Sequence, residues 1–225
     1  MKSLVVCSGG LDSVSMALIE YDKGHEVELM SFNYGQKATK ELNVVKELAD
    51  KYGWKHSIID ISSLKAIFGK NQLTDSTLNV KNTYDKSVVV PLRNAMFLQI
   101  AYIYAVTNCF DNVILGSHLD DCEIVDGHYA FPDCSPIFFK TFETAMFSGL
   151  LPSDTHTKIL SASILGYHKK DLIKRAYKID KEMLFKTWSC YSNNEKQCGV
   201  CDSCKNRRKY FIDAEIEDET EYEVK

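Results

Sequence analysis

Seven residues near the N-terminus combine glycine, hydroxyl and carboxylate groups: Cys7-Ser8-Gly9-Gly10-Leu11-Asp12-Ser13. We call residues 7–13 the glycine loop. The loop joins an apolar run to a helical pattern, so backbone N–H groups and the positive end of a helix dipole would converge there. Glycines let the backbone approach a ligand closely, and Ser8 and Ser13 add hydroxyl donors. The pattern predicts a phosphate site, with a simple strand-to-helix turn as the alternative.

Asp12 is the unusual member of this loop, because a carboxylate repels phosphate unless a cation lies between them. Mg²⁺ prefers carboxylate and phosphate oxygens, so we expect a magnesium–nucleotide ligand. The loop lacks the Gly-Lys-Ser/Thr of a Walker A motif. In a parallel sheet such a ligand should lie at the carboxyl ends of the strands.

Four of the eight cysteines lie close together near the C-terminus: Cys190, Cys198, Cys201 and Cys204. Two successive Cys-x-x-Cys steps plus a fourth thiol can close a tetrahedral four-sulfur site, which favours structural zinc. An iron–sulfur cluster is the alternative, because four thiolates also bind such clusters. The basic run KNRRK (205–209) beside these thiols could contact phosphates, but a solvated helix face is the default interpretation.

The elements that must position these motifs alternate between strand and helix. Apolar runs predict strands at 3–7, 26–34, 56–61, 112–118 and 158–164, and amphipathic patterns predict helices at 13–24, 39–53, 138–147 and 169–179. A short strand, a Pro turn and an apolar helix are expected within 87–110. The fold class is therefore α/β, a Rossmann-like parallel sheet with helices on both faces and a small C-terminal zinc-binding segment. The polar stretch 69–87 is either a lid or a plain insertion, and 119–136 is expected to be irregular.

Composition fits one soluble unit. The chain has 225 residues and a net charge of −4, which argues against a stable nucleic-acid partner. Its longest apolar run, 95–106, is too short to span a membrane, and no secretory signal is visible. We expect a cytoplasmic protein with an α/β domain (1–187), a zinc-binding segment with a short helix (188–212) and an acidic tail (213–225).

Both motifs, in this order and at this distance, resemble those of the QueC family of 7-cyano-7-deazaguanine synthases, over nearly the whole chain. Ser-Gly-Gly-Leu-Asp-Ser matches the loop of the N-type ATP pyrophosphatases, the PP-loop superfamily that includes this family. The other matching stretches are YGQKATKEL (34–42), LTD (73–75), VVPLRNAMFL (89–98), FPDC (131–134) and TWSCY…CGVCDSC. The resemblance implies an adenine nucleotide alpha-hydrolase-like fold and a homodimer.

The resemblance also implies an ATP-dependent ligase that converts 7-carboxy-7-deazaguanine and ammonia to 7-cyano-7-deazaguanine. Asp12, Ser13 and Arg93 would be catalytic, and Arg93 and Asp133 would contact the deazaguanine. ATP would be bound by the glycine loop, Gln36 and Lys169. Simpler readings remain open: Arg93 could only start a helix, Asp133 could only form a turn, and Cys134 could be a buried apolar residue.

Three features of the sequence depart from that family. Leu92 stands where the family has Gly, and SPIFF follows Asp133-Cys134 where the family has Arg and an acidic residue. The stretch between Gly116 and Pro132 is longer, and it carries His118, Asp120, Asp121 and His128. These departures motivate an alternative, a QueC-like defence enzyme that joins the activated carboxylate to an amine of another molecule. A tRNA-modifying enzyme and a non-enzymatic zinc module are further alternatives.

Overall fold

The computed structural model describes residues 1–36, 40–68, 90–125, 128–154 and 156–224. Its centre is a five-stranded sheet in the order β3-β2-β1-β4-β7, and every neighbouring pair is parallel. The order reverses direction between β1 and β4, which is where open α/β sheets bind ligands. The strands are β1 (Lys2–Val6), β2 (Glu26–Asn33), β3 (Lys55–Asp60), β4 (Asn112–Leu115) and β7 (Lys158–Ser161).

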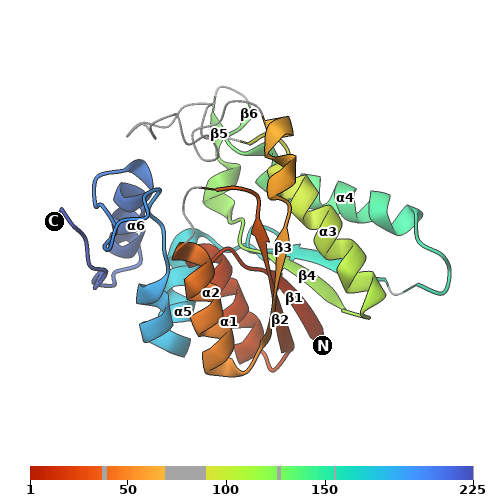
Figure 1. The fold of residues 1–225 in the computed structure, drawn as a ribbon, viewed down its shortest axis with the longest axis horizontal. Coiled ribbons are helices and arrows are strands. Elements are labelled where there is room, and N and C mark those ends of the chain that lie inside the picture. The colour runs from red at the N-terminus through yellow and green to blue at the C-terminus, as the bar shows by residue number, and fades with distance from the viewer. Residues whose placement is uncertain (37–39, 69–89, 126–127, 155, 225) are drawn as a thin grey trace.

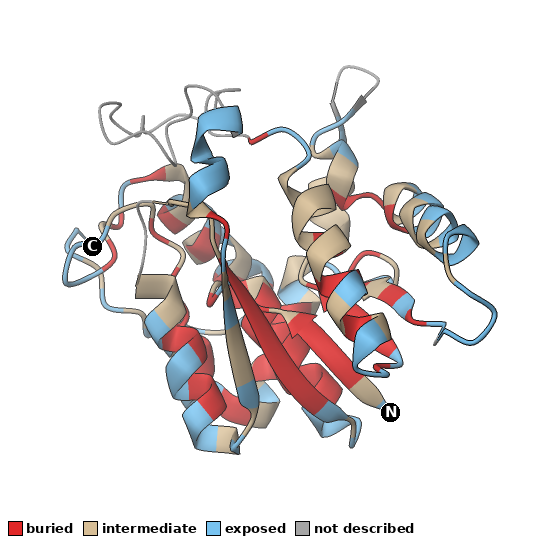
Figure 2. Cartoon of the chain, turned by 45° about the vertical axis from the view of Figure 1, so that its right-hand side comes forward, coloured by how far each residue is buried: buried red, intermediate tan, exposed pale blue. Residues whose placement is uncertain are grey.

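Helices cover both faces of the sheet (Figure 1). One face carries α1 (Leu11–Asp22), α2 (Lys40–Tyr52) and α5 (Lys169–Lys186), and the other carries α3 (Arg93–Thr107) and α4 (Pro136–Ser148). Side chains alternate across each strand, so Val5 packs under α1 while Leu4 packs under α3. Both residues are fully buried. Figure 2 shows the central strands coloured as buried, as is typical of a parallel sheet covered on two sides.

The predicted α/β class and the five strands predicted by range are confirmed. The short strand expected at the start of 87–110 falls on residues up to 89, which lie outside the described residues. The main differences concern element ends. Strand β4 stops at Leu115, three residues before the predicted end, because the chain turns at Gly116 toward α1. Helix α5 runs to Lys186 instead of 179, with a break at Asp180. There the Asp180 carboxylate accepts the Met183 N–H at 3.1 Å and thereby caps a second helical stretch.

The stretch predicted to be irregular, 119–136, contains short elements. A 3₁₀ turn at Leu119–Cys122, a two-stranded hairpin of β5 (Ile124–Val125) and β6 (His128–Tyr129), and a second 3₁₀ turn at Pro132–Cys134 follow one another. The predicted lid (69–87) and the LTD match (73–75) lie outside the described residues. In the part of the chain that is described, we find no helix long and apolar enough to cross a membrane.

The C-terminal residues pack onto the α/β layer and share its core. Trp188, Cys204 and Phe211 are buried in the same cluster as α1 and α5. Helix α6 (Asp202–Asp213) carries the basic run, and the acidic tail folds back so that the Glu223 N–H reaches the Gln197 carbonyl at 2.9 Å. The segment 188–212 is therefore continuous with the domain that it follows.

Candidate functional site

The glycine loop connects β1 to α1 at the carboxyl edge of the sheet, and its side chains bond within the loop. Ser13 Oγ accepts the Ser8 N–H at 3.1 Å and donates to the Gly10 carbonyl at 3.1 Å. Ser8 Oγ accepts the Gly10 N–H at 3.2 Å. These bonds shape a turn above the N-terminus of α1, the position at which a helix favours anions. Cys7 lies beneath the turn, where burial raises the pKa of its thiol to about 11, so it is an inert core residue.

Two glycines are required by close backbone contacts. Gly9 has a φ of +90°, and a Cβ there would lie 2.0 Å from the Glu41 carbonyl oxygen. A Cβ on Gly116 would lie 2.8 Å from the Ser13 nitrogen. Gly116 thus lets the end of β4 contact the start of α1. The site is therefore bounded by β4 as well as by β1. Gly116 was not predicted as a site residue, although its place directly after an apolar strand was a usable signal.

The Asp12 carboxylate is held beside this turn by Lys169. The Lys169 ammonium donates to Asp12 Oδ2 at 3.1 Å, and the Lys169 backbone N–H donates to Asp120 Oδ2 at 2.7 Å. Asp12 Oδ1 is buried and has no hydrogen-bond partner among the described residues. A buried carboxylate oxygen without a donor is in the state that a Mg²⁺ ion would satisfy. Asp12 and Lys169, which were each predicted to contact the nucleotide, are therefore in direct contact with one another.

Three further titratable groups follow β4 and cluster with Asp12 and Lys169. His118 is 3 % exposed, and its Nε2 lies 3.7 Å from Asp12 Oδ1. Burial raises the pKa of Asp121, with a contribution from Asp12 that His118 and Lys169 oppose. Burial also acts on Asp120, but hydrogen bonds from the Lys169 N–H and from His168 hold its pKa below the usual range. The long segment that departs from the resembled family thus reaches the glycine loop.

Arg93 starts α3 on the other side of the site and is flanked by two aromatic rings. Its guanidinium donates to Tyr34 Oη at 3.2 Å and lies 5.9 Å from the Phe97 ring. Although burial disfavours its charge, Tyr34, Glu41 and Asp133 raise the Arg93 pKa. Arg93 Nε is buried without a partner in the described part of the chain. A half-buried, charged guanidinium with a buried, unpartnered Nε–H is suited to an anionic ligand.

Glu41, at the start of α2, lies in the family-like stretch 34–42 and was not predicted as a site residue. Burial raises its carboxyl pKa to about 8, and the charge of Arg93 opposes that shift. Its backbone carbonyl abuts Gly9, so the residue lies between the glycine loop and the Arg93 side. Sequence alone offered little signal, because helix starts are often acidic.

The other residues considered from the sequence, Gln36, Asp133 and Cys134, make local contacts that do not reach the glycine loop directly. The Gln36 amide accepts the Tyr34 N–H at 2.9 Å and donates to the Phe32 carbonyl at 3.0 Å, so it folds over its own turn. The Asp133 carbonyl accepts from Asn94 at 3.5 Å, which ties its 3₁₀ turn to α3. Cys134 is buried, and burial raises the pKa of its thiol to about 12, as expected of a core residue.

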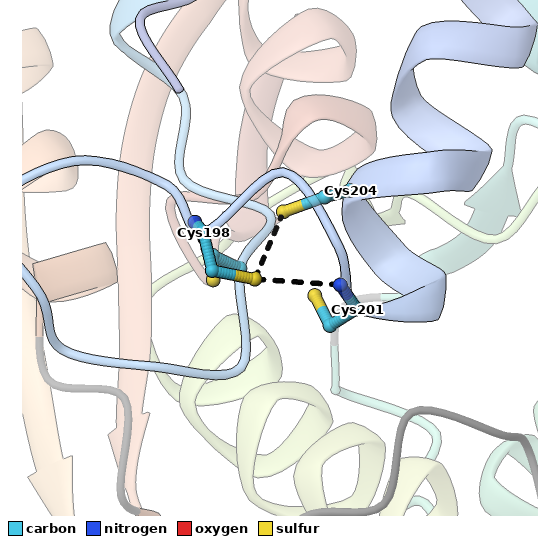
Figure 3. Close-up of side chains that lie close together, drawn as sticks. Cys198, Cys201 and Cys204 are labelled. Atoms are coloured by element: carbon cyan, nitrogen blue, oxygen red, sulfur yellow. Dashed lines mark hydrogen bonds between the residues drawn. The ribbon is translucent and has the colours of Figure 1, made fainter. Parts of the chain in front are cut away.

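The four predicted metal ligands converge. The sulfur atoms of Cys190, Cys198, Cys201 and Cys204 all lie within 4.8 Å of one another. Figure 3 shows Cys198 facing Cys204, with 3.9 Å between the sulfurs, and accepting the Cys201 N–H at 3.4 Å. Zinc–sulfur bonds of 2.3 Å in a tetrahedron place sulfurs about 3.8 Å apart. The cluster therefore fits a single tetrahedral ion such as zinc.

The basic run beside the thiols was expected to form a solvated helix face, and one of its residues is instead buried. Arg207 is 1 % exposed rather than solvated. Its guanidinium donates to the carbonyls of Thr187 and Leu184, both at 3.2 Å, and to Ser189 Oγ at 3.1 Å. The charge is accommodated because nearby carbonyls meet its donors. Arg207 thus anchors α6 to α5.

A parallel sheet with a glycine loop at the reversal of strand order, and an unpaired carboxylate oxygen beside the loop, is the arrangement of an α/β fold of the nucleotide-binding type. Its fold is like that of a 4-thiouridine synthetase solved as a complex with RNA and ATP. The TM-score is 0.51 at 14% identity, over 95% of this chain and 50% of that one. This likeness concerns the fold alone.

The chain belongs to the QueC family, because the profile described as "Queuosine biosynthesis protein QueC" matches residues 2–215. It is 38% identical to the 7-cyano-7-deazaguanine synthase of Brucella anthropi over 99% of this chain and 94% of that one. The enzyme of the same name from Brucella ovis is 37% identical over the same shares.

Proposed function

We propose that this protein is a 7-cyano-7-deazaguanine synthase, an ATP-dependent ligase that acts in queuosine biosynthesis. It joins ammonia to 7-carboxy-7-deazaguanine and converts the carboxylate to a nitrile. The observation that carries the proposal is the intact glycine loop beside Asp12, in a chain that matches this family almost end to end. Relatives with that name share its length as well as its sequence.

The chemistry requires activation, because a carboxylate is a poor electrophile at neutral pH. ATP supplies it: the carboxylate oxygen bonds to the α-phosphorus as pyrophosphate leaves, and ammonia then displaces AMP and loses a proton to give the amide. The amide oxygen bonds to the α-phosphorus of a second ATP, again releasing pyrophosphate, and it leaves as AMP while the nitrogen loses its two protons, so that the nitrile forms. The protein positions the reactants and neutralises charge.

On the nucleotide side, the glycine loop would cradle the phosphates through the backbone N–H groups of Ser8 to Ser13. The unpaired Asp12 Oδ1 would face Mg²⁺, and Lys169 would carry a positive charge between Asp12 and the phosphates. Gln36 would contact ATP from the end of β2, after its amide releases the backbone groups that it now bonds.

On the acceptor side, Arg93 would bind the substrate carboxylate through its unpaired Nε–H, between the rings of Tyr34 and Phe97. Asp133, whose charge acts on Arg93, would meet the N–H edge of the deazaguanine. Both assignments place the reacting carboxylate between α3 and the glycine loop.

The four-cysteine cluster would hold zinc as a structural ion, because all four positions are taken by thiolates and none is left for chemistry. Among the described residues every cysteine is unpaired, which fits the reducing cytoplasm that we propose as its location. We expect no stable nucleic-acid partner, and filter binding to tRNA at physiological salt should show no retention.

A homodimer is also part of the proposal. Helices α3 and α4 present large apolar side chains to solvent, including Ile103 at 57 % and Phe147 at 51 % exposure. A groove between the two helices is lined by Tyr102, Val106 and Met146. Exposed apolar area of this kind favours contact with a second copy. An Ile103→Glu variant should then elute as a monomer while the wild type elutes as a dimer.

The decisive experiment is incubation of the purified protein with ATP, Mg²⁺, 7-carboxy-7-deazaguanine and ammonium, followed by mass spectrometry. Nitrile and AMP are the expected products. Accumulation of the amide without nitrile, or transfer only to another amine, would contradict the proposal in favour of the amide-forming alternative. An Asp12→Ala protein should show no ATP turnover.

A further inference from the structure

His118 is a buried side chain that the proposed chemistry does not yet use. It follows β4 by three residues, and its ring faces three carboxylates. Nε2 lies 3.7 Å from Asp12 Oδ1, and Nδ1 lies 3.4 Å from Asp120 Oδ2 and 3.7 Å from Asp121 Oδ2. Nδ1 is buried with no hydrogen-bond partner among the described residues, as is Asp12 Oδ1. Such unpaired buried atoms are uncommon in folded proteins and invite an explanation.

The position of the His118 ring is fixed from several sides. Its backbone N–H donates to Asp121 Oδ2 at 3.1 Å, and the next residue, Leu119, donates its N–H to the Tyr167 carbonyl at 3.0 Å. The ring of Tyr210, on α6, lies edge-on with 6.2 Å between the centroids. The imidazole therefore stays directed at Asp12.

Asp12 is consequently approached by a cationic or N–H donor group at each of its two oxygens. Lys169 donates to Oδ2 at 3.1 Å, and the His118 imidazole Nε2 lies 3.7 Å from Oδ1. Lys169 itself is fixed by its backbone N–H bond to Asp120. If Oδ1 lost its neighbour, the carboxylate could turn about its terminal bond and direct its charge at the glycine loop, where phosphates must bind.

We propose that His118 is a positioning residue for Asp12. The electrostatic contact of its Nε2 with Asp12 Oδ1, 3.7 Å apart, and the Lys169 hydrogen bond to Oδ2 together fix the plane of the carboxylate, so that Oδ1 can also face Mg²⁺ beside the nucleotide phosphates. The inference rests on the ATP site of the proposed function and is independent of the acceptor and of the final product. The family's resembled motifs do not include this histidine, which lies in the stretch where the sequence departs from them.

A purely structural role makes the opposite prediction for two substitutions. His118 precedes the 3₁₀ turn Leu119–Cys122, and at such a position Asn is among the preferred residues while Gln is not. The Gln side-chain nitrogen reaches the place of imidazole Nε2, whereas the Asn nitrogen reaches only that of Nδ1. Gln therefore preserves the proposed contact, and Asn preserves the turn.

The test compares His118→Gln and His118→Asn by calorimetric titration with Mg²⁺-ATP and by thermal melting. We expect the Gln variant to bind ATP within about threefold of wild type and the Asn variant to bind about tenfold more weakly, the size typical of lost support for a carboxylate. The Asn variant should melt at the same temperature as the Gln variant or higher. Equal affinities for the two variants, or tighter binding by Asn, would overturn the inference.

Repeating the pair in an Asp12→Asn background tests the route of action. If His118 acts through Asp12, the difference in ATP affinity between Gln and Asn disappears there, and a persisting difference contradicts the proposal. ATP binding is measured without the acceptor. A wild-type protein that makes no nitrile would therefore count against the proposed function, but the ATP affinities of the Gln and Asn variants could still be compared.

Discussion

The backbone N–H of Trp188 donates a hydrogen bond to the Gly9 carbonyl at 3.1 Å. The Trp188 indole N–H in turn donates to the carbonyls of Cys190 and Ser192, at 2.9 and 3.1 Å. One residue thus joins the first cysteine of the four-thiol cluster to the centre of the glycine loop. The four-thiol site and the nucleotide site are parts of one framework.

Removal of the metal should therefore weaken ATP binding as well as stability. Metal binding is folding free energy in such sites, so chelation or Cys204→Ser should lower the melting temperature by at least about 5 °C. Elemental analysis should find about one zinc per chain. Cys109→Ser, at an exposed thiol outside the cluster, is the control. Iron in place of zinc, or unchanged ATP affinity after metal loss, would contradict this account.

Gly9 should tolerate no side chain. In Gly9→Ala the Cβ would meet the Glu41 carbonyl at 2.0 Å, and φ is +90°. Gly24 provides a matched control, because its φ is +78° and nothing lies within 4 Å of its Cβ position. Gly24→Ala should cost about 1 kcal/mol from backbone strain alone. Gly9→Ala should cost at least about 2 kcal/mol more, since backbone must shift. Urea unfolding of both variants measures the difference, and equal costs would argue against the close contact.

Leu92 carries strain that glycine would relieve. It caps α3 with a φ of +54° and is 64 % exposed, so no buried contact compensates for the left-handed backbone. Leu92→Gly should raise the free energy of unfolding by up to about 1 kcal/mol, because relief of strain exceeds the entropy cost of glycine. Leu92→Ala keeps a Cβ at the same φ and should not stabilise. A Gly variant that is less stable than the Ala variant would show that the leucine side chain contributes packing.

The predictable parts of this protein are those encoded locally. The glycine loop and the four cysteines are contiguous strings, so spacing alone located them, and alternating apolar runs located the strands. Gly116 and Trp188 were not assigned because their roles depend on contacts across 100 or more positions, with Ser13 and with Gly9. Arg207 was misjudged for the same reason: a basic run is normally solvated, and the acceptors that make its burial favourable lie at the end of α5, in Ser189 and in Thr220.

Glu41 should make stability depend on pH in a defined window. Its ordinary pKa is 4.5 and its folded pKa is raised to about 8 by burial, so between these values the unfolded chain loses a proton that the folded chain keeps. The folded state is then favoured at low pH, and its stability falls as pH rises through this window, by at most about 1.4 kcal/mol per pH unit for one proton. Glu41→Gln cannot ionise, so its stability relative to wild type should increase from pH 5 to pH 8. Glu26→Gln, at an exposed site on β2, should show no such trend. Urea unfolding at several pH values provides the measurement, and parallel curves for wild type and Glu41→Gln would mean that the carboxyl is ionised in the folded protein.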